Sequence, residues 1–97
     1  MRKIMVRYKL KRDRVEEHEA LIRAVFGELA ESAPEGIQYG AFKAPDGVSY
    51  VHLAFIGAPK NPLDAIAAFK AFTARIQERC VEPPELTELE PIGSYGF

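Results

Sequence analysis

The chain has 97 residues, of which 47% are hydrophobic and 28% are charged, as is typical of a globular domain. This length predicts one domain, residues 1–97, with a single core. Thirteen Lys and Arg against fourteen Asp and Glu give a formal charge of -1. The sequence therefore lacks the basic excess of proteins held by phosphate contacts, and nucleic acid is excluded as an expected partner.

The N-terminus and the single cysteine indicate the compartment. Charges interrupt Met1–Arg7 before any apolar run is long enough for a signal peptide, and no stretch reaches the length of a membrane span. Cys80 has no second cysteine with which to form an internal disulfide. We therefore expect a cytoplasmic protein with no membrane partner.

The first third of the chain predicts a strand followed by a helix. Apolar residues alternate along Lys3–Leu10, which is the period-two pattern of a strand with one buried face. Asp13 followed by Glu16 is a variant of the capping box, and Pro34 and Gly36 end the helix that it starts. The stripe at helical spacing contains Val15, His18, Leu21, Ile22, Val25, Phe26 and Leu29.

Two further strands are predicted at Ile37–Lys43 and Val48–Ile56. The turn signal at residues 45–47, Pro-Asp-Gly, joins them as a hairpin.

A second helix is predicted from Asn61 to about Cys80, with Asn61 as the cap and Pro62 at the first helical position. Phe69 and Phe72 fall on its buried stripe and are interpreted as core residues. The last strand, Leu86–Glu90, is expected to begin only after two consecutive prolines at 83 and 84.

These elements predict an α+β fold, the ferredoxin-like split βαββαβ sandwich, with a four-stranded antiparallel sheet and two helices on one face. The other sheet face is left open. A half-exposed strand should be polar at every second position, but Val48–Ile56 is apolar on both faces. We therefore expect a homodimer in which the open faces pack together, and we place His52 on the partner-facing side.

Two functions of this fold fit the sequence poorly. RNA recognition motifs require stacking aromatics on the third strand, and residues 46–53 match that pattern only at Gly47, Tyr50 and Val51. Amino-acid-binding regulatory domains place a ligand at a glycine-bearing turn after the first strand. Here that turn, Lys11–Arg14, contains no glycine to let the backbone approach a ligand.

Over its full length the chain resembles the antibiotic-biosynthesis-monooxygenase-like branch of the dimeric alpha-beta barrel superfamily. The similarity lies in the strand Ile-Met-Val-Arg-Tyr-Lys-Leu, the helix start Asp-Arg-Val-Glu-Glu-His-Glu, and the segment Asp-Ala-Ile-Ala-Ala-Phe of the second helix. It implies dimerisation through the open sheet faces and a pocket between sheet and helices. Some members oxidise polycyclic aromatics with molecular oxygen and without metal or flavin.

This chain departs from the branch at two points. Members often carry a histidine in the second helix, near the place where this chain has Phe69. Haem-degrading relatives rely on a tryptophan, and this chain contains none, which disfavours haem degradation.

Cofactor-free oxidation would need a base, a group that stabilises the resulting anion, and side chains that orient an aromatic substrate. The catalytic candidates are His52 as base and Arg7 as anion stabiliser, and the substrate-binding candidates are Tyr39 and Tyr50. The alternatives are an interface or core role for His52 and an edge or interface cation for Arg7. The function expected is cofactor-independent oxidation of a small aromatic or phenolic ligand, and the alternative is a non-catalytic binding or structural homodimer.

The remaining reactive residues predict little chemistry. His18 lies among acidic residues and is expected to be solvated or half-buried on its helix. No metal site is expected, because His18, His52 and Cys80 lack ligand spacing, and no cofactor is expected either. Arg79 could slightly lower the pKa of Cys80. The aromatic tail, with Tyr95 and Phe97, is expected to dock at the dimer seam or cap a pocket.

Overall fold

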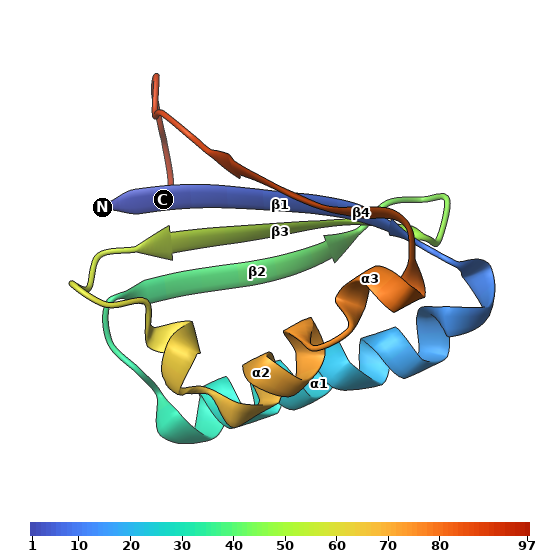
Figure 1. Cartoon of the computed structure of the whole chain (residues 1–97). Coiled ribbons are helices and arrows are strands. Elements are labelled where there is room, and N and C mark those ends of the chain that lie inside the picture. Colours follow the sequence, from blue (N-terminus) through green and yellow to red (C-terminus); the bar gives the residue numbers. More distant parts are fainter.

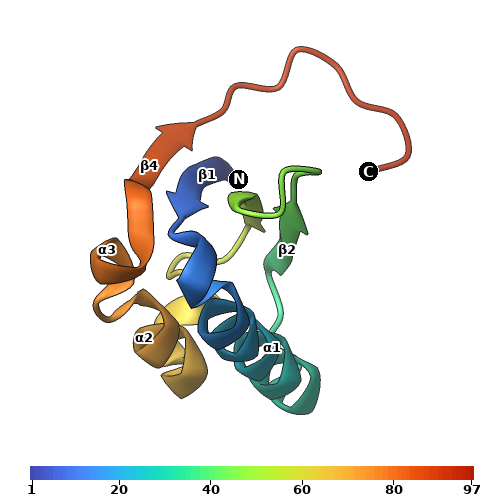
Figure 2. The same cartoon turned by 90° about the vertical axis from the view of Figure 1, so that its right-hand side faces the viewer.

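The computed structural model describes residues 1–97. Its elements are β1 Arg2–Leu10, η1 Arg12–Arg14, α1 Val15–Ser32, β2 Ile37–Lys43, β3 Ser49–Ile56, η2 Pro62–Ala65, α2 Ala67–Thr73, α3 Ile76–Arg79 and β4 Cys80–Glu88. The four strands form one antiparallel sheet in the order β2-β3-β1-β4. The helices cover one face of this sheet, and the C-terminal tail passes over the other (Figures 1 and 2). The predicted ferredoxin-like split βαββαβ sandwich is confirmed.

The helical segment after β3 is broken, so the prediction of one helix from Asn61 to Cys80 was wrong. The Asn61 cap itself is confirmed, because its Oδ1 accepts a hydrogen bond from the Leu63 N–H at 3.0 Å. Ile66 is extended, which separates η2 from α2, and Arg75 has a left-handed φ of 58°, which separates α2 from α3. The second break places Arg79, at the end of α3, against α1.

β4 begins at Cys80, six residues before the predicted start, and contains both prolines. The pairing with β1 is irregular between Lys9↔Glu82 and Arg7↔Glu85, and Pro83 and Pro84 fall in this interval. A bulge on an edge strand leaves positions without a ladder hydrogen bond, so a residue lacking an N–H is tolerated there.

His52 faces the helices, and its predicted place on the partner-facing side was wrong. Along β3 the buried residues are Tyr50, His52, Ala54 and Ile56, whereas the alternate positions are half-buried on the open face. Because the strand is apolar on both faces, its alternation did not reveal which set meets the helices. The main core cluster under the sheet is Tyr8, Leu10, Val25, Tyr50, Phe72, Ile76 and Cys80.

None of the helices combines the length and apolar character needed to cross a bilayer.

Candidate active site

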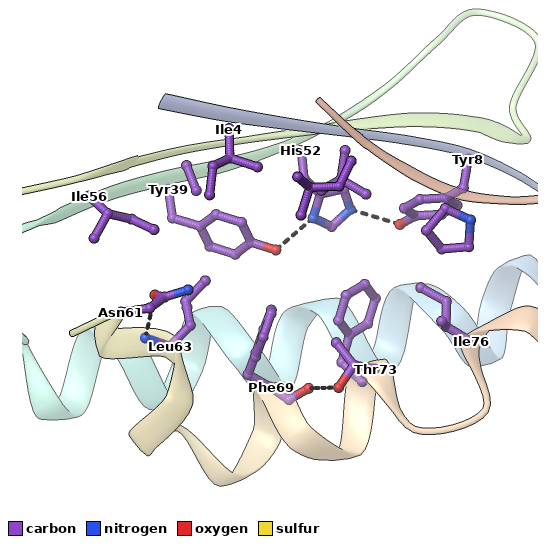
Figure 3. A pocket seen from close by; sticks show the side chains of 15 residues that line it. Ile4, Tyr8, Tyr39, His52, Ile56, Asn61, Leu63, Phe69, Thr73 and Ile76 are labelled. Carbon is purple, nitrogen blue, oxygen red and sulfur yellow. Dashed lines mark hydrogen bonds between the residues drawn. The ribbon is translucent and has the colours of Figure 1, made fainter. Parts of the chain in front are cut away.

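A cavity of about 240 Å³ lies between the sheet and the helical segments η2, α2 and α3. Its walls are mostly apolar and include the rings of Phe69 and Phe72, both of which were interpreted as core residues from the sequence. Figure 3 shows the sheet side chains above the cavity and those of the helical segments below it. The full lining is Ile4, Val6, Tyr8, Tyr39, His52, Ala54, Ile56, Asn61, Leu63, Phe69, Phe72, Thr73, Ile76, Pro84 and Leu86.

A line of three polar side chains crosses the sheet side of this cavity (Figure 3). The Tyr39 hydroxyl lies 2.6 Å from Nδ1 of His52, and Nε2 of His52 lies 2.7 Å from the Tyr8 hydroxyl. Tyr39 comes from β2, His52 from β3 and Tyr8 from β1. Neither tyrosine is directly opposite His52 on its neighbouring strand, and each lies two positions along from the residue that is. Diagonal neighbours on one sheet face are within reach of aromatic side chains, so the pleat and the register together build this contact.

The line continues into the core beyond the cavity. His18 of α1 places Nε2 2.5 Å from the Tyr8 hydroxyl, and Arg79 donates from Nε to Nδ1 of His18 at 3.1 Å. The Arg79 guanidinium also donates to the backbone carbonyls of Phe72 and Ala74. We call Arg79, His18, Tyr8, His52 and Tyr39 the buried polar chain.

The prediction that His18 is solvated or half-buried was wrong, because its side chain is 0% exposed. Its place on the apolar stripe of α1 was the signal that could have found it. Arg79 is only 3% exposed and was not predicted to be buried. Its position depends on the left-handed turn at Arg75, which no sequence pattern marks.

Burial keeps both histidines neutral at physiological pH. It lowers the pKa of His52 to about 4, because the charged ring would lose its hydration. Burial and, after it, the Arg79 charge lower the pKa of His18 to about 4. Burial raises the pKa of the Tyr8 and Tyr39 hydroxyls, which therefore remain protonated.

The other two sequence candidates lie away from the buried polar chain. Tyr50 is on the same sheet face, but its hydroxyl donates to Oε2 of Glu19 at 2.6 Å and it does not line the cavity. Arg7 pairs with Val51 of β3 and Glu85 of β4, on the open face opposite His52. Its guanidinium lies 4.0 Å from the Glu85 carboxylate. The structure thus brings Tyr39 and His52 together and leaves Arg7 outside their cavity.

Cys80 and the aromatic tail lie outside the cavity. No group of three or more His, Cys, Asp or Glu side chains is placed to hold a metal ion. Burial raises the pKa of the Cys80 thiol and outweighs the decrease that the Arg79 charge causes, so the net shift is opposite to the one predicted. Tyr95 and Phe97 of the tail are almost fully exposed, and the Phe97 ring lies 6.1 Å from that of Phe55 on the open face.

No protein-family model and no curated protein sequence matches this chain. Solved structures match its fold. Rv0793 from Mycobacterium tuberculosis has a TM-score of 0.75 at 18% identity, over 96% of both chains. A candidate antibiotic biosynthesis monooxygenase from Nitrosomonas europaea has a TM-score of 0.75 at 14% identity, over 96% of this chain and 100% of that one.

A third match is a variant of SnoaB, a cofactor-independent oxygenase from Streptomyces nogalater. Its TM-score is 0.70 at 13% identity, over 99% of this chain and 97% of that one. The chain has the fold of the antibiotic biosynthesis monooxygenase-like alpha-beta barrels. At these identities the likeness concerns the fold, so the chemistry of this chain must be argued from its own cavity.

Proposed function

We propose that this chain binds a small aromatic molecule in the cavity under the sheet and oxidises it with molecular oxygen, without a bound cofactor. The observation that carries the proposal is the cavity itself, whose apolar, ring-lined walls are interrupted by the Tyr39–His52–Tyr8 line. Its volume of about 240 Å³ lies just below the ~300–1,000 Å³ of sites for drug-sized ligands. A ligand of two or three fused rings suits that space.

The chemistry proposed is oxidation of an acidic CH₂ group held between aromatic or carbonyl carbons. Loss of one proton to water gives a delocalised anion, which can transfer electrons to oxygen directly. The carbon loses two hydrogens, one oxygen atom becomes its carbonyl, and the other leaves as water, so CH₂ and O₂ give C=O and H₂O. The protein must bind the ring and stabilise the anion, which are both tasks for fixed dipoles in a largely apolar cavity.

Within this proposal His52 acts through Tyr39. Both of its ring nitrogens are already engaged by tyrosine hydroxyls, and its pKa of about 4 makes it a weak base at neutral pH. Tyr39 is the residue of the line that meets the ligand. Arg7 and Tyr50 keep other proposed roles, Arg7 as a cation of the open face and Tyr50 as a support for α1 through Glu19.

We also propose that the chain is a homodimer paired through its open sheet face. Met5, Leu53 and Phe55 are only half-buried there, and Phe42 is 57% exposed. An apolar face of this extent, with charged residues at its edges, is the kind of surface that a second copy covers.

Oxygen uptake tests the proposal directly. The purified chain is mixed with anthrone, whose CH₂ group lies between two aryl carbons, and oxygen is followed with an electrode. Naphthols and naphthoquinols, which have acidic O–H groups but no such CH₂ group, are compared with it. Turnover should fall about 100-fold in Tyr39→Phe, as for loss of one anion-stabilising donor, and should be unchanged in the control Tyr95→Phe. Unchanged turnover in His52→Ala would exclude an essential role for His52.

One observation favours a second candidate function, a binding protein without catalysis. No side chain lining the cavity is a free base, since His52 is held at both ring nitrogens. Binding of these aromatics with no oxygen uptake from any of them would support this alternative.

A further inference from the structure

We infer that the hydrogen bonds of the buried polar chain all run in one direction, with each residue donating to the next from Arg79 to Tyr39. The Tyr39 hydroxyl is then left to donate its own hydrogen bond into the cavity. The ligand group that it selects is a carbonyl or anionic oxygen. This inference rests on the proposed function only in requiring that the cavity hold a small aromatic molecule.

The direction is set at Arg79, because a guanidinium donates hydrogen bonds and cannot accept them. Its Nε lies 3.1 Å from Nδ1 of His18, so that nitrogen must carry a lone pair. An imidazole with one unprotonated nitrogen is neutral and has its single N–H on the other nitrogen. His18 is therefore the Nε2–H tautomer, and it donates to the Tyr8 oxygen at 2.5 Å.

The hydrogen bonds from Tyr8 to Tyr39 run in the same direction. The Tyr8 oxygen accepts from His18, so its own hydrogen is directed to its second partner, Nε2 of His52, at 2.7 Å. His52 then accepts at Nε2 and must carry its hydrogen on Nδ1. That N–H donates to the Tyr39 oxygen at 2.6 Å.

Tyr39 is the last residue of the buried polar chain and has one hydrogen still to donate. Its hydroxyl has no protein partner other than His52, and Tyr39 lines the cavity (Figure 3). The surrounding walls are largely apolar, so this hydroxyl is a polar anchor in a site that otherwise recognises ring surface.

The charge of Arg79 reinforces the preference for a negative or partly negative ligand. No carboxylate lies within ion-pair distance of Arg79, which is only 3% exposed. Of the carboxylates on the adjacent helix α1, Glu17 pairs with Arg14 and Glu19 with Lys43. The buried polar chain thus contains one positive charge with no ion-pair partner, and neutral histidines lie between that charge and the ligand.

The five residues of the buried polar chain divide into one that contacts the ligand and four that position it. Tyr39 contacts the ligand as an anion stabiliser, whereas Arg79, His18, Tyr8 and His52 are positioning residues that hold its hydrogen toward the cavity. A donor at the end of such a chain strengthens as negative charge develops on its acceptor, because each link is polarised by the next. His52 in this tautomer donates toward the ligand side and takes no proton from it.

Nitrogen-15 NMR tests the direction without any substitution. The chain contains only two histidines, so long-range proton–nitrogen spectra of the labelled protein show two rings. At pH 7 we expect His18 as the Nε2–H tautomer and His52 as the Nδ1–H tautomer. A proton on Nε2 of His52, or a charged ring at either residue, would overturn the inference.

A matched pair of bicyclic probes tests the ligand group. 1-Tetralone carries a carbonyl, and tetralin has the same rings without it. Calorimetry should show tetralone binding about tenfold more tightly, as for one good hydrogen bond, and its carbonyl stretch should move to lower frequency on binding. Both effects should vanish in Tyr39→Phe and persist in Tyr95→Phe.

The two experiments separate the possible failures. Equal binding of both probes to the wild type would overturn the selection of an oxygen acceptor by Tyr39. Binding of neither probe would count against the cavity as an aromatic site, and so against the proposed function. The histidine tautomers would still decide the direction of the hydrogen bonds in the buried polar chain. In Arg79→Met the His52 tautomer and the carbonyl shift should change, and in Arg79→Lys they should be restored toward the wild type. If Arg79→Met does not fold, the wild-type spectrum alone decides the direction.

Discussion

The two buried histidines should make the fold markedly sensitive to mild acid. The pKa of both rings is lowered to about 4 in the folded chain, whereas an unfolded histidine titrates near ~6.5. Between these two values the unfolded state binds more protons than the folded state. The free energy of unfolding must therefore fall as the pH is lowered from about 6.5 to about 4.

Linkage gives the size of the effect. From pH 7 to pH 5, a shift of this size removes about 2 kcal/mol per histidine, so both together remove about 4 kcal/mol. The steepest slope, near the middle of the interval, is about 2.4 kcal/mol per pH unit. Small domains have only ~5–15 kcal/mol of total stability, so this loss would bring the chain close to unfolding.

Urea denaturation at pH 7, 6 and 5, at one fixed protein concentration, measures this slope. The substitution His52→Gln removes one of the two rings and should halve the slope. Carboxylates with a lowered pKa, such as Glu19, also contribute free energy of unfolding that is lost in acid. That loss begins only as the pH falls below their pKa in the unfolded state, about 4.3, which is outside most of this interval. A free energy of unfolding that stays level between pH 6.5 and 5 would refute the assignment of both rings as buried and neutral.

Three substitutions test the backbone and the open face. Arg75→Gly should raise the free energy of unfolding, measured with urea, by about 0.5–1 kcal/mol, because glycine adopts the left-handed φ of 58° without strain and this gain exceeds its entropic cost. The control Lys70→Gly, in the regular helix α2, should lower that free energy. Gly36→Ala should cost about 2–4 kcal/mol, since φ is +80° and the added Cβ would lie 2.9 Å from that of Ala58, and an unchanged melting curve would contradict this. Leu53→Glu on the open face should shift the mass measured by light scattering from dimer to monomer, and a wild type that is already monomeric would refute the proposed pairing.

Local patterns were sufficient to predict most of the fold. The alternation in β1, the turn before β3 and the Asn61 cap are contacts between residues close in sequence, and each was found where it was expected. The helix break was missed because Arg75 is an ordinary helix former that takes a left-handed φ under tertiary constraint. The early start of β4 was missed because a bulge opposite β1 removes the usual penalty for proline.

The site was less predictable because it depends on register and on long-range contacts. Tyr39 and His52 were singled out by residue type alone, and only the pairing of β2 with β3 shows that they meet. His18 lies among glutamates in sequence, which suggested solvent, although its helical position placed it inward. Arg79 could not have been assigned to the buried polar chain from the sequence. Its side-chain partner His18 is 61 residues away on α1, and its other partners are backbone carbonyls at Phe72 and Ala74.

The direction of the buried polar chain bears on how a cofactor-free reaction could begin in this cavity. A charged guanidinium without a carboxylate partner is costly to bury, and here it is held by two backbone carbonyls and His18. An anionic ligand would supply the missing negative charge, and the same interaction would lower the pKa of that ligand's own acidic group. Ionisation then needs no strong protein base, because the proton can leave to water while Tyr39 and the charge behind it hold the anion. The absence of a free base in the cavity is therefore compatible with catalysis for a substrate that is already weakly acidic, and it argues against substrates whose C–H or O–H bond is not.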